Sequence, residues 1–229
     1  MKVELLARTS IDIRAVANHS PEMGDDWVSS SPDLLAEFAG RSCYQSFHKP
    51  NPKTAANQDY LKNILDQGHF SVLEHASATF YVTGVSRALT HELIRHRHLS
   101  YSELSQRFVD ITDADPVTPP AIKGNDGAED EFKNAFSDAS YAYDQVVEAL
   151  SGKGLTRKQI REAARAVMPN ATETRIVVTG NMRAWRDMLH KRYSVHADAE
   201  IREFAAEILR QLKDIAPSTF QDFPEVPFS

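Results

Sequence analysis

Residues 91–108 read HELIRHRHLSYSELSQRF and hold three histidines, three arginines and two glutamates in eighteen positions. Upstream, residues 76–84, ASATFYVTG, have the β-branched and aromatic content of a strand, and the pattern after Gly84 changes to helical spacing. The charged stretch is therefore predicted to follow a strand and a helix. Its composition fits three kinds of site: a zinc site, a nucleic-acid surface, or a pocket for an anionic ligand.

Strands and helices are predicted on both sides of this stretch, without regular βαβ succession. Asn181 stands where a helix N-cap belongs, and the Asp-, Pro- and Gly-rich residues 109–129 are predicted as a long loop. The predicted class is α+β: a mixed single domain over residues 1–229, with a central antiparallel-rich sheet flanked by helices. The other predicted strands are 3–7 and 174–180, and the other predicted helices are 32–40, 55–67, 132–150, 156–168, 182–194 and about 197–215.

The composition is that of an ordinary globular protein. Of the 229 residues, 41% are hydrophobic and 25% are charged, and the net charge of −6 is the opposite of a general nucleic-acid binder's. Cys43 is the single cysteine, so an intrachain disulfide is excluded. The N-terminus lacks the apolar core of a signal peptide, and no apolar run approaches the roughly 20 residues that span a bilayer. We expect a cytoplasmic protein with no membrane and no nucleic-acid partner.

A zinc site is the weakest of the three explanations. HELIRH resembles the H-E-x-x-H helix, but that motif needs histidines at i and i+4, and Arg95 stands four residues after His91. On a continuous helix His96 would lie about 140° round from His91. No metal site is therefore predicted.

A nucleic-acid surface and a plain helix end also explain the stretch poorly. Glu92 and Glu103 interrupt the basic cluster, whereas a surface that follows phosphates needs cations in series. Cations at a helix C-terminus contribute roughly 0.3–1 kcal/mol each, which accounts for one or two of these residues. Neither explanation accounts for SYSELSQR, which offers hydroxyl, amide and guanidinium donors together. That donor set suits a phosphate and a pyrimidine edge.

Two further groups of cations support an anionic ligand. Lys158, Arg161 and Arg165 are spaced so that one helix face presents all three, although Glu162 is able to pair with Arg165. The helix after Asn181 adds three arginines: Arg183, Arg186 and Arg192. A solvated face is the plain alternative, but local cationic groups on an acidic chain favour anions bound in focused pockets.

The sequence resembles a known family at these residues. Arg95-His96-Arg97, seven further residues and Ser105 match the RHR-x7-S signature of flavin-dependent thymidylate synthases, the ThyX family. The segments GHFSVLEHASATFYVTG, ARAVMPNATETRIVVTGN and RYSVHADAEIR also resemble this family, in particular its actinobacterial members. The resemblance covers about residues 41–220 and implies the thymidylate synthase-complementing protein fold.

The resemblance implies an activity in de novo dTMP biosynthesis. It implies methylation of dUMP to dTMP, with 5,10-methylenetetrahydrofolate as carbon donor and FAD, reduced by NADPH, as hydride source. It also implies a homotetramer whose subunits share active sites. Such enzymes use no cysteine nucleophile, and Cys43 is interpreted as structural or pocket-lining. The alternative from a different class is a non-catalytic nucleotide- or RNA-binding module.

Site residues are carried over from the family by position. Arg192 is expected to be catalytic, because a guanidinium against uracil stabilises charge at the N3–C4=O edge. Asp187 departs from the family pattern, as do Ser102 and Phe108, which stand where some relatives have Asn and Tyr. The implied FAD-binding residues are Ser71, Arg95, His96, Arg97, Glu103, Asn181, Met182, Arg183 and Asp187. The implied dUMP-binding residues are Glu92, Arg95, Glu103, Leu104, Ser105, Gln106, Arg107, Arg165 and Arg192.

Overall fold

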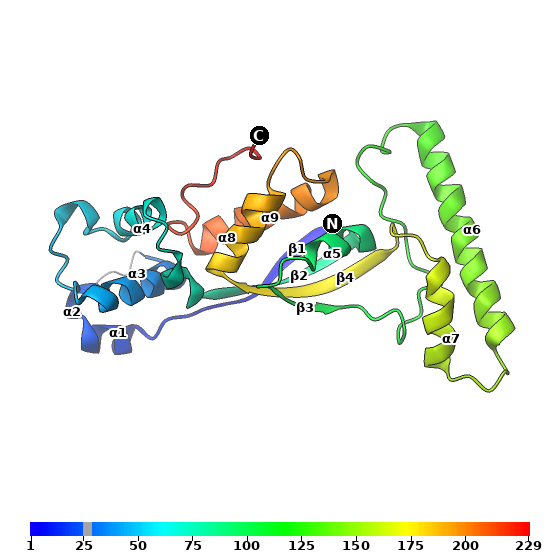
Figure 1. The fold of residues 1–229 in the computed structure, drawn as a ribbon, viewed down its shortest axis with the longest axis horizontal. Coiled ribbons are helices and arrows are strands. Elements are labelled where there is room, and N and C mark those ends of the chain that lie inside the picture. The colour runs from blue at the N-terminus through cyan, green and yellow to red at the C-terminus, as the bar shows by residue number, and fades with distance from the viewer. Residues whose placement is uncertain (25–28) are drawn as a thin grey trace. The chain divides into compact units, whose positions relative to one another are not determined.

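A four-stranded antiparallel sheet organises the chain in the computed structural model, which describes residues 1–24 and 29–229 (Figure 1). Its order is β1-β2-β4-β3, and bonds such as Thr9 N–H to the Ser77 carbonyl and Leu104 N–H to the Arg175 carbonyl fit antiparallel pairs. The predicted α+β class with an antiparallel sheet is confirmed. The strands are β1 (Lys2–Arg8), β2 (Ser77–Ser86), β3 (Ser100–Glu103) and β4 (Glu173–Asn181).

The two longest strands show the alternation that a half-buried strand requires. In β4, Thr174, Ile176 and Val178 are buried, while the residues between them are more exposed. The side chains of a strand point alternately to opposite faces, so this pattern turns one face of β4 toward the core. Sequence periodicity was therefore a sound guide to the sheet.

Backbone contacts divide the described chain into two compact units, and the boundary between them falls within each of the four strands. The prediction of a single domain over residues 1–229 stays a prediction. The first unit comprises Met1–Lys2, Val82–Arg95 and Tyr101–Val177. The second unit comprises Val3–Tyr81, His96–Ser100 and Val178–Ser229.

In the first unit, α6 and α7 lie side by side (Figure 1). Ile111, Tyr143 and Ala164 form a small buried core there, which fastens part of the irregular segment to the helices. The predicted loop 109–129 ends earlier, because Asn125 caps α6. The predicted helix 156–168 is α-helical only over its first part. The helices are α5 (Arg87–Leu93), α6 (Asp126–Leu150), α7 (Arg157–Ala164) and the 3-10 turn η3 (Arg165–Val167).

In the second unit, α8 and α9 lie together against the sheet (Figure 1). Trp185 of α8 is fully buried; its ring meets Phe80 edge-on at 5.2 Å, and its Nε1–H donates to the Ala78 carbonyl at 3.2 Å. The helices are α1 (Ile13–His19), α2 (Pro21–Gly24), α3 (Ser31–Tyr44), α4 (Asn57–Asp66), α8 (Met182–Arg192) and α9 (Ala199–Ile215). The 3-10 turns are η1 (Pro52–Thr54) and η2 (Phe70–Glu74).

One helix end differs from its prediction for a packing reason. The expected helix 32–40 was to close at Gly40, but α3 continues to Tyr44 and ends at Gln45 in a left-handed conformation, φ 48°. Gly40 lies within the helix, at a position where a Cβ would collide with the Tyr60 hydroxyl. The glycine therefore allows α3 and α4 to approach closely rather than ending α3.

Candidate functional site

The arginine-rich segment after α5 is a set of turns, not a helix. Helix α5 ends at Leu93, and β3 begins at Ser100. The Tyr101 hydroxyl donates to the Leu93 carbonyl at 2.6 Å, so this helix-end carbonyl is satisfied by a side chain. Because α5 ends before His96, the helical angle predicted between His91 and His96 is wrong. The SYSELSQR segment, predicted as a loop, begins as strand β3.

Leu99 packs against β4 within the second unit. Its side chain is 5% exposed and lies where a Cβ on Gly180 of β4 would have to be. The Leu99 N–H also donates to the His96 carbonyl at 3.1 Å, which closes the turn. Because protein interiors are closely packed, this wedge fixes the position of the His96 backbone.

His96 is buried and acts as a hydrogen-bond acceptor. Only 6% of it is exposed, and its Nε2 accepts from the Nε–H of Arg192 at 3.0 Å. Its Nδ1 faces an Asp187 carboxylate oxygen at 3.8 Å. Burial, and next the Arg192 charge, lower the pKa of His96 to about 4, so the ring is neutral near pH 7.

Asp187, a departure from the family pattern, is an ionised partner in this group. Burial opposes its ionisation, but the 2.8 Å contact with Lys191 and the nearby histidines outweigh it, so the pKa of Asp187 is lowered. Lys191 lies one turn further along α8, at the i+4 spacing that favours such pairs. The carboxylate is thus held between a cation and the His96 ring.

Arg95 and Arg97 differ sharply from the histidine between them. Both side chains are exposed. Among residues 1–24 and 29–229, neither makes a hydrogen bond or an ion pair. Their guanidinium groups therefore keep their donors for a ligand or another subunit.

Three cavities of the second unit share Arg183. One of about 360 Å³ is lined by Asn181, Arg183 and Asp187, so three residues predicted to bind FAD meet there. Another of about 390 Å³ adds Ser71, and a third of about 190 Å³ reaches Phe70. Arg183 is half exposed, and its guanidinium contacts Glu74 at 2.6 Å.

The start of α8 is a capped helix end, whose N–H groups at Met182 and Ala184 have acceptors within the chain. The Asn181 side chain accepts from the Ala184 N–H at 2.8 Å, which confirms the predicted N-cap. Met182 was also predicted to bind FAD, but it is 1% exposed and its N–H donates to the Ala76 carbonyl at 3.0 Å. The geometry makes Met182 an anchor of α8 in the core.

The sequence reading missed part of the cavity lining. Tyr44, His69 and Phe70 line the same cavity as Ser71, and so does Cys43, as the pocket-lining interpretation expected. Tyr44 is 73% exposed, which is unusual for an aromatic residue. His69 and Phe70 belong to the GHFSVLEH block, so that block held the missing signal.

Glu103 of the first unit is held by three donors on one oxygen. Its Oε1 accepts from Arg87 at 3.1 Å and from the hydroxyls of Thr90 and Thr174 at 3.0 and 3.2 Å. A carboxylate held this way joins α5, β3 and β4. Its predicted contacts with FAD and dUMP stay predictions, but this geometry makes it first a clamp for the segment that follows.

The predicted dUMP segment Leu104–Arg107 leaves β3 in the first unit. The Leu104 N–H donates to the Arg175 carbonyl at 2.9 Å. The Ser105 carbonyl accepts the backbone N–H bonds that close the turn after it. Gln106 is 4% exposed, and within the described chain its Nε2 has no partner. Gln106 is therefore almost closed off from solvent in this structure.

Phe108 lies between two cations at the end of this segment. Its ring is 61% exposed, with the Arg107 guanidinium 5.8 Å and the Lys158 ammonium 5.5 Å from the ring centre. Arg165 makes no side-chain hydrogen bond or ion pair with the described residues. The first unit therefore carries cations for a phosphate beside an aromatic face.

Two arginines counted as possible ligand contacts have structural partners instead. Arg161 donates to the Phe108 carbonyl and to Asp110, both at 2.6 Å. Arg186 is 4% exposed and forms a two-pronged pair with Asp222 at 2.7 and 2.6 Å. On the α7 face, the suggested pairing of Glu162 with Arg165 is absent from the contacts of the described residues, and the acid that pairs on this face is Asp110, with Arg161.

Neither a metal cluster nor a membrane helix is found in the described ranges. Among residues 1–24 and 29–229, no group of three His, Cys, Asp or Glu side chains has the geometry to hold a metal ion. In the same ranges, every helix is too short or too polar to cross a bilayer.

Comparison with known sequences decides the family. A model of the family described as thymidylate synthase complementing protein matches residues 27–218. The chain belongs to this family.

Members of the family from mycobacteria and their phages match over almost the whole length. The "Probable flavin-dependent thymidylate synthase" of Mycobacterium phage L5 is 50% identical over 244 residues, covering 100% of both chains. That of Mycobacterium phage D29 is 52% identical over 234 residues, covering 100% of this chain and 99% of its own. The "Flavin-dependent thymidylate synthase" of Mycobacterium avium (strain 104) is 52% identical over 231 residues, covering 97% and 90%.

Proposed function

We propose that this chain is a flavin-dependent thymidylate synthase that methylates dUMP to dTMP. The observation that carries the proposal is similarity of about 50% identity along the whole chain to proteins of that name. The intact Arg95-His96-Arg97-x7-Ser105 signature agrees with it. A flavin cofactor follows from the activity, and FAD is the form we propose.

Several residues predicted to bind FAD suit an anionic flavin nucleotide. The Asn181-capped start of α8 lines a cavity together with Arg183, whose guanidinium group suits a phosphate. Arg95 and Arg97 supply guanidinium donors that the described chain does not use. These arginines, Ser71 and the Asn181–Arg183 turn are the residues we expect to hold FAD, which supplies hydride when bound and reduced.

For dUMP, we propose that the cations of the first unit bind the phosphate. The guanidinium groups of Arg107 and Arg165 are charge-assisted donors, and Ser105 adds a hydroxyl. Glu92, Leu104 and Gln106 are proposed as further contacts. Such contacts fix the position of the nucleotide but do not activate the ring.

Arg192 is the residue that we propose for activation. A fixed positive charge at the N3–C4=O edge stabilises negative charge on that edge of the ring, which makes the ring carbon more nucleophilic toward the one-carbon unit. No thiol is required for this route, and Cys43, the sole cysteine, is exposed at a cavity wall. The role of Arg192 is therefore electrostatic, and its value depends on accurate placement.

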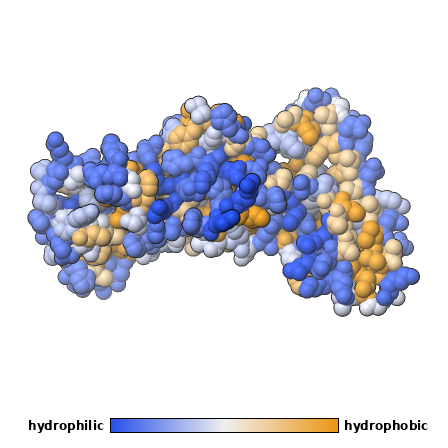
Figure 2. Space-filling view, viewed as in Figure 1, coloured by the Kyte–Doolittle hydropathy of each residue, from blue (hydrophilic) through white to orange (hydrophobic). Residues whose placement is uncertain are grey.

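We propose a cytoplasmic homotetramer that also uses NADPH and methylenetetrahydrofolate. The surface of the first unit supports assembly, since α6 has 25 residues and buries only Phe136 and Tyr143. Figure 2 shows hydrophobic residues gathered along the face of α6, where Tyr141 is 66% exposed. Apolar area of this kind on a long helix suits burial against another subunit.

The direct test is turnover by the purified protein. With dUMP, methylenetetrahydrofolate, NADPH and FAD we expect dTMP by mass spectrometry, and none when any one of them is omitted. Fresh protein should also show the visible absorption of oxidised flavin. A colourless protein that takes up no flavin and forms no dTMP would overturn the proposal. Tight, steeply salt-dependent binding to single-stranded RNA without flavin would favour the RNA-binding alternative.

A further inference from the structure

The middle residue of the signature is buried, unlike its two neighbours. Arg95 and Arg97 are exposed, whereas His96 is 6% exposed and its Nε2 accepts from Arg192 Nε at 3.0 Å. We infer that His96 is a positioning residue that holds the Arg192 guanidinium against the uracil ring, and that it does not bind the flavin. The inference rests on the proposed function of Arg192.

The hydrogen-bond pattern fixes which proton His96 carries. Because Arg192 has only donors, Nε2 must offer its lone pair, and the ring proton is then on Nδ1. Nδ1 faces the Asp187 carboxylate at 3.8 Å, which favours that tautomer. Lys191 holds the same carboxylate at 2.8 Å, so Asp187, His96 and Arg192 form an ordered chain.

This chain of contacts leaves the ring little capacity for a ligand. Nε2 is engaged by Arg192, Nδ1 is turned toward Asp187, and the ring is almost closed off from solvent. The depressed pKa agrees, because a protonated ring has no acceptor for Arg192. A flavin contact through the His96 side chain would require breaking one of these interactions.

The hydrogen bond from Arg192 Nε to His96 restricts the orientation of the guanidinium group. An arginine side chain has many rotamers, and the bond to His96 removes most of them. The turn that carries His96 is fixed by Leu99 against Gly180, so the acceptor is itself rigid. The terminal nitrogens of Arg192 are then aimed by a buried residue, as electrostatic stabilisation requires.

The inference is tested first by His96→Leu and His96→Gln in the flavin-loaded protein. For His96→Leu we expect kcat for dTMP formation to fall about 100-fold, as expected for a misplaced catalytic group. The KM for dUMP and the flavin content should change little. His96→Gln retains an acceptor and should recover most of the activity. His91→Gln, an exposed histidine of α5, is the matched control and should remain unchanged.

The opposite assignment gives a different pattern. If His96 binds flavin, His96→Leu will lose its visible absorption, and excess FAD will restore turnover; that result would overturn the inference. Turnover of His96→Leu within a few-fold of the parent would also overturn it. In an Arg192→Ala background, His96→Leu should cause no further loss of activity, because the two residues act as one unit.

A crystal structure of each variant separates this inference from the proposed function. We expect the Arg192 guanidinium to move in His96→Leu and to stay in place in His96→Gln, whatever the activity. An unmoved Arg192 in His96→Leu contradicts positioning, whereas an unaltered protein that makes no dTMP contradicts only the proposed function. Should His96→Leu fail to fold, His96→Asn replaces it, because the shorter amide keeps polarity but cannot reach Arg192.

Discussion

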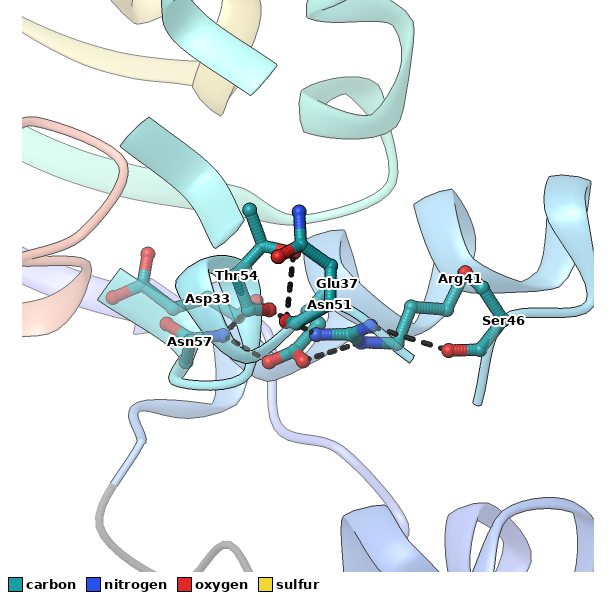
Figure 3. Close-up of polar contacts among 7 residues, drawn as sticks. All are labelled: Asp33, Glu37, Arg41, Ser46, Asn51, Thr54 and Asn57. Carbon is teal, nitrogen blue, oxygen red and sulfur yellow. Dashed lines mark hydrogen bonds and ion pairs between the residues drawn. The ribbon is translucent and has the colours of Figure 1, made fainter. Parts of the chain in front are cut away.

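Arg41 and Arg97 are arginines of the same unit with opposite surroundings. Arg41 is 2% exposed; its Nε donates to Glu37 at 2.6 Å, and its terminal nitrogens donate to the Ser46 and Thr54 carbonyls at 3.2 and 2.7 Å (Figure 3). Arg97 is exposed, and it has neither a hydrogen bond nor an ion pair with the described residues.

The difference shows what a buried arginine requires. A buried charge is tolerated only when paired and hydrogen-bonded, and Arg41 meets this with Glu37 and with the Tyr60 ring, 4.3 Å from its guanidinium. Glu37 in turn accepts from Asn57 at 2.8 Å (Figure 3). Arg41 thereby joins α3 to α4 and has no donor to offer a ligand. Arg97 contributes little to the stability of the fold, and its guanidinium donors remain for a ligand or another subunit.

The largest expected effect is on stability, from Arg41→Met. Removing the guanidinium leaves Glu37 buried and unpaired, which should lower the free energy of unfolding by about 3–5 kcal/mol. Urea unfolding followed by circular dichroism measures this. Arg97→Met is the matched control and should change stability by less than about 0.5 kcal/mol. An equal loss of unfolding free energy in both variants would mean that burial and pairing do not distinguish Arg41 from Arg97.

Arg192→Ala tests the catalytic end of the comparison. We expect dTMP formation to fall about 100- to 1000-fold, as for loss of one preorganised charge, while flavin content and folding are retained. Steady-state kinetics with measured flavin occupancy gives the answer. Turnover that survives within a few-fold would rule out Arg192 as the activating residue.

Arg107→Ala should affect substrate binding rather than chemistry. Loss of one charge-assisted contact to the phosphate costs roughly 1.5–3 kcal/mol, so the KM for dUMP should rise about 10- to 100-fold. Flavin content should stay constant, and Arg161→Ala, whose partners are Asp110 and the Phe108 carbonyl, should raise KM much less. Parallel loss of flavin and dUMP binding would contradict the division of roles.

The last effect concerns pH and the buried histidine. The pKa of His96 falls from 6.5 unfolded to about 4 folded, so its contribution to stability is complete above pH 6.5 and is lost as the pH falls toward 4. The slope is at most about 1.4 kcal/mol per pH unit for one proton. Unfolding of His96→Gln across this window should be flatter than that of the parent protein. Identical slopes would mean that His96 is not kept neutral by the fold.

The sequence predicted the regular elements well where the signal is local. The alternation in 174–180 gave β4, Asn181 gave the start of α8, and helical spacing gave most of α6 and α9. These features depend on neighbours within one or two turns, which the sequence displays directly. The signature at 95–105 likewise needed no structure to suggest a nucleotide and a flavin.

The fate of each charge was decided by tertiary structure. Arg186 looked like a ligand contact until Asp222, 36 residues away, was found to neutralise it. His96 was predicted as a cofactor contact, and its acceptor nitrogen was found to accept from Arg192, 96 residues away. Sequence alone determined which cations the chain has and which elements carry them. Only the tertiary structure decided which donors remain available, because pairing and burial depend on partners distant along the chain.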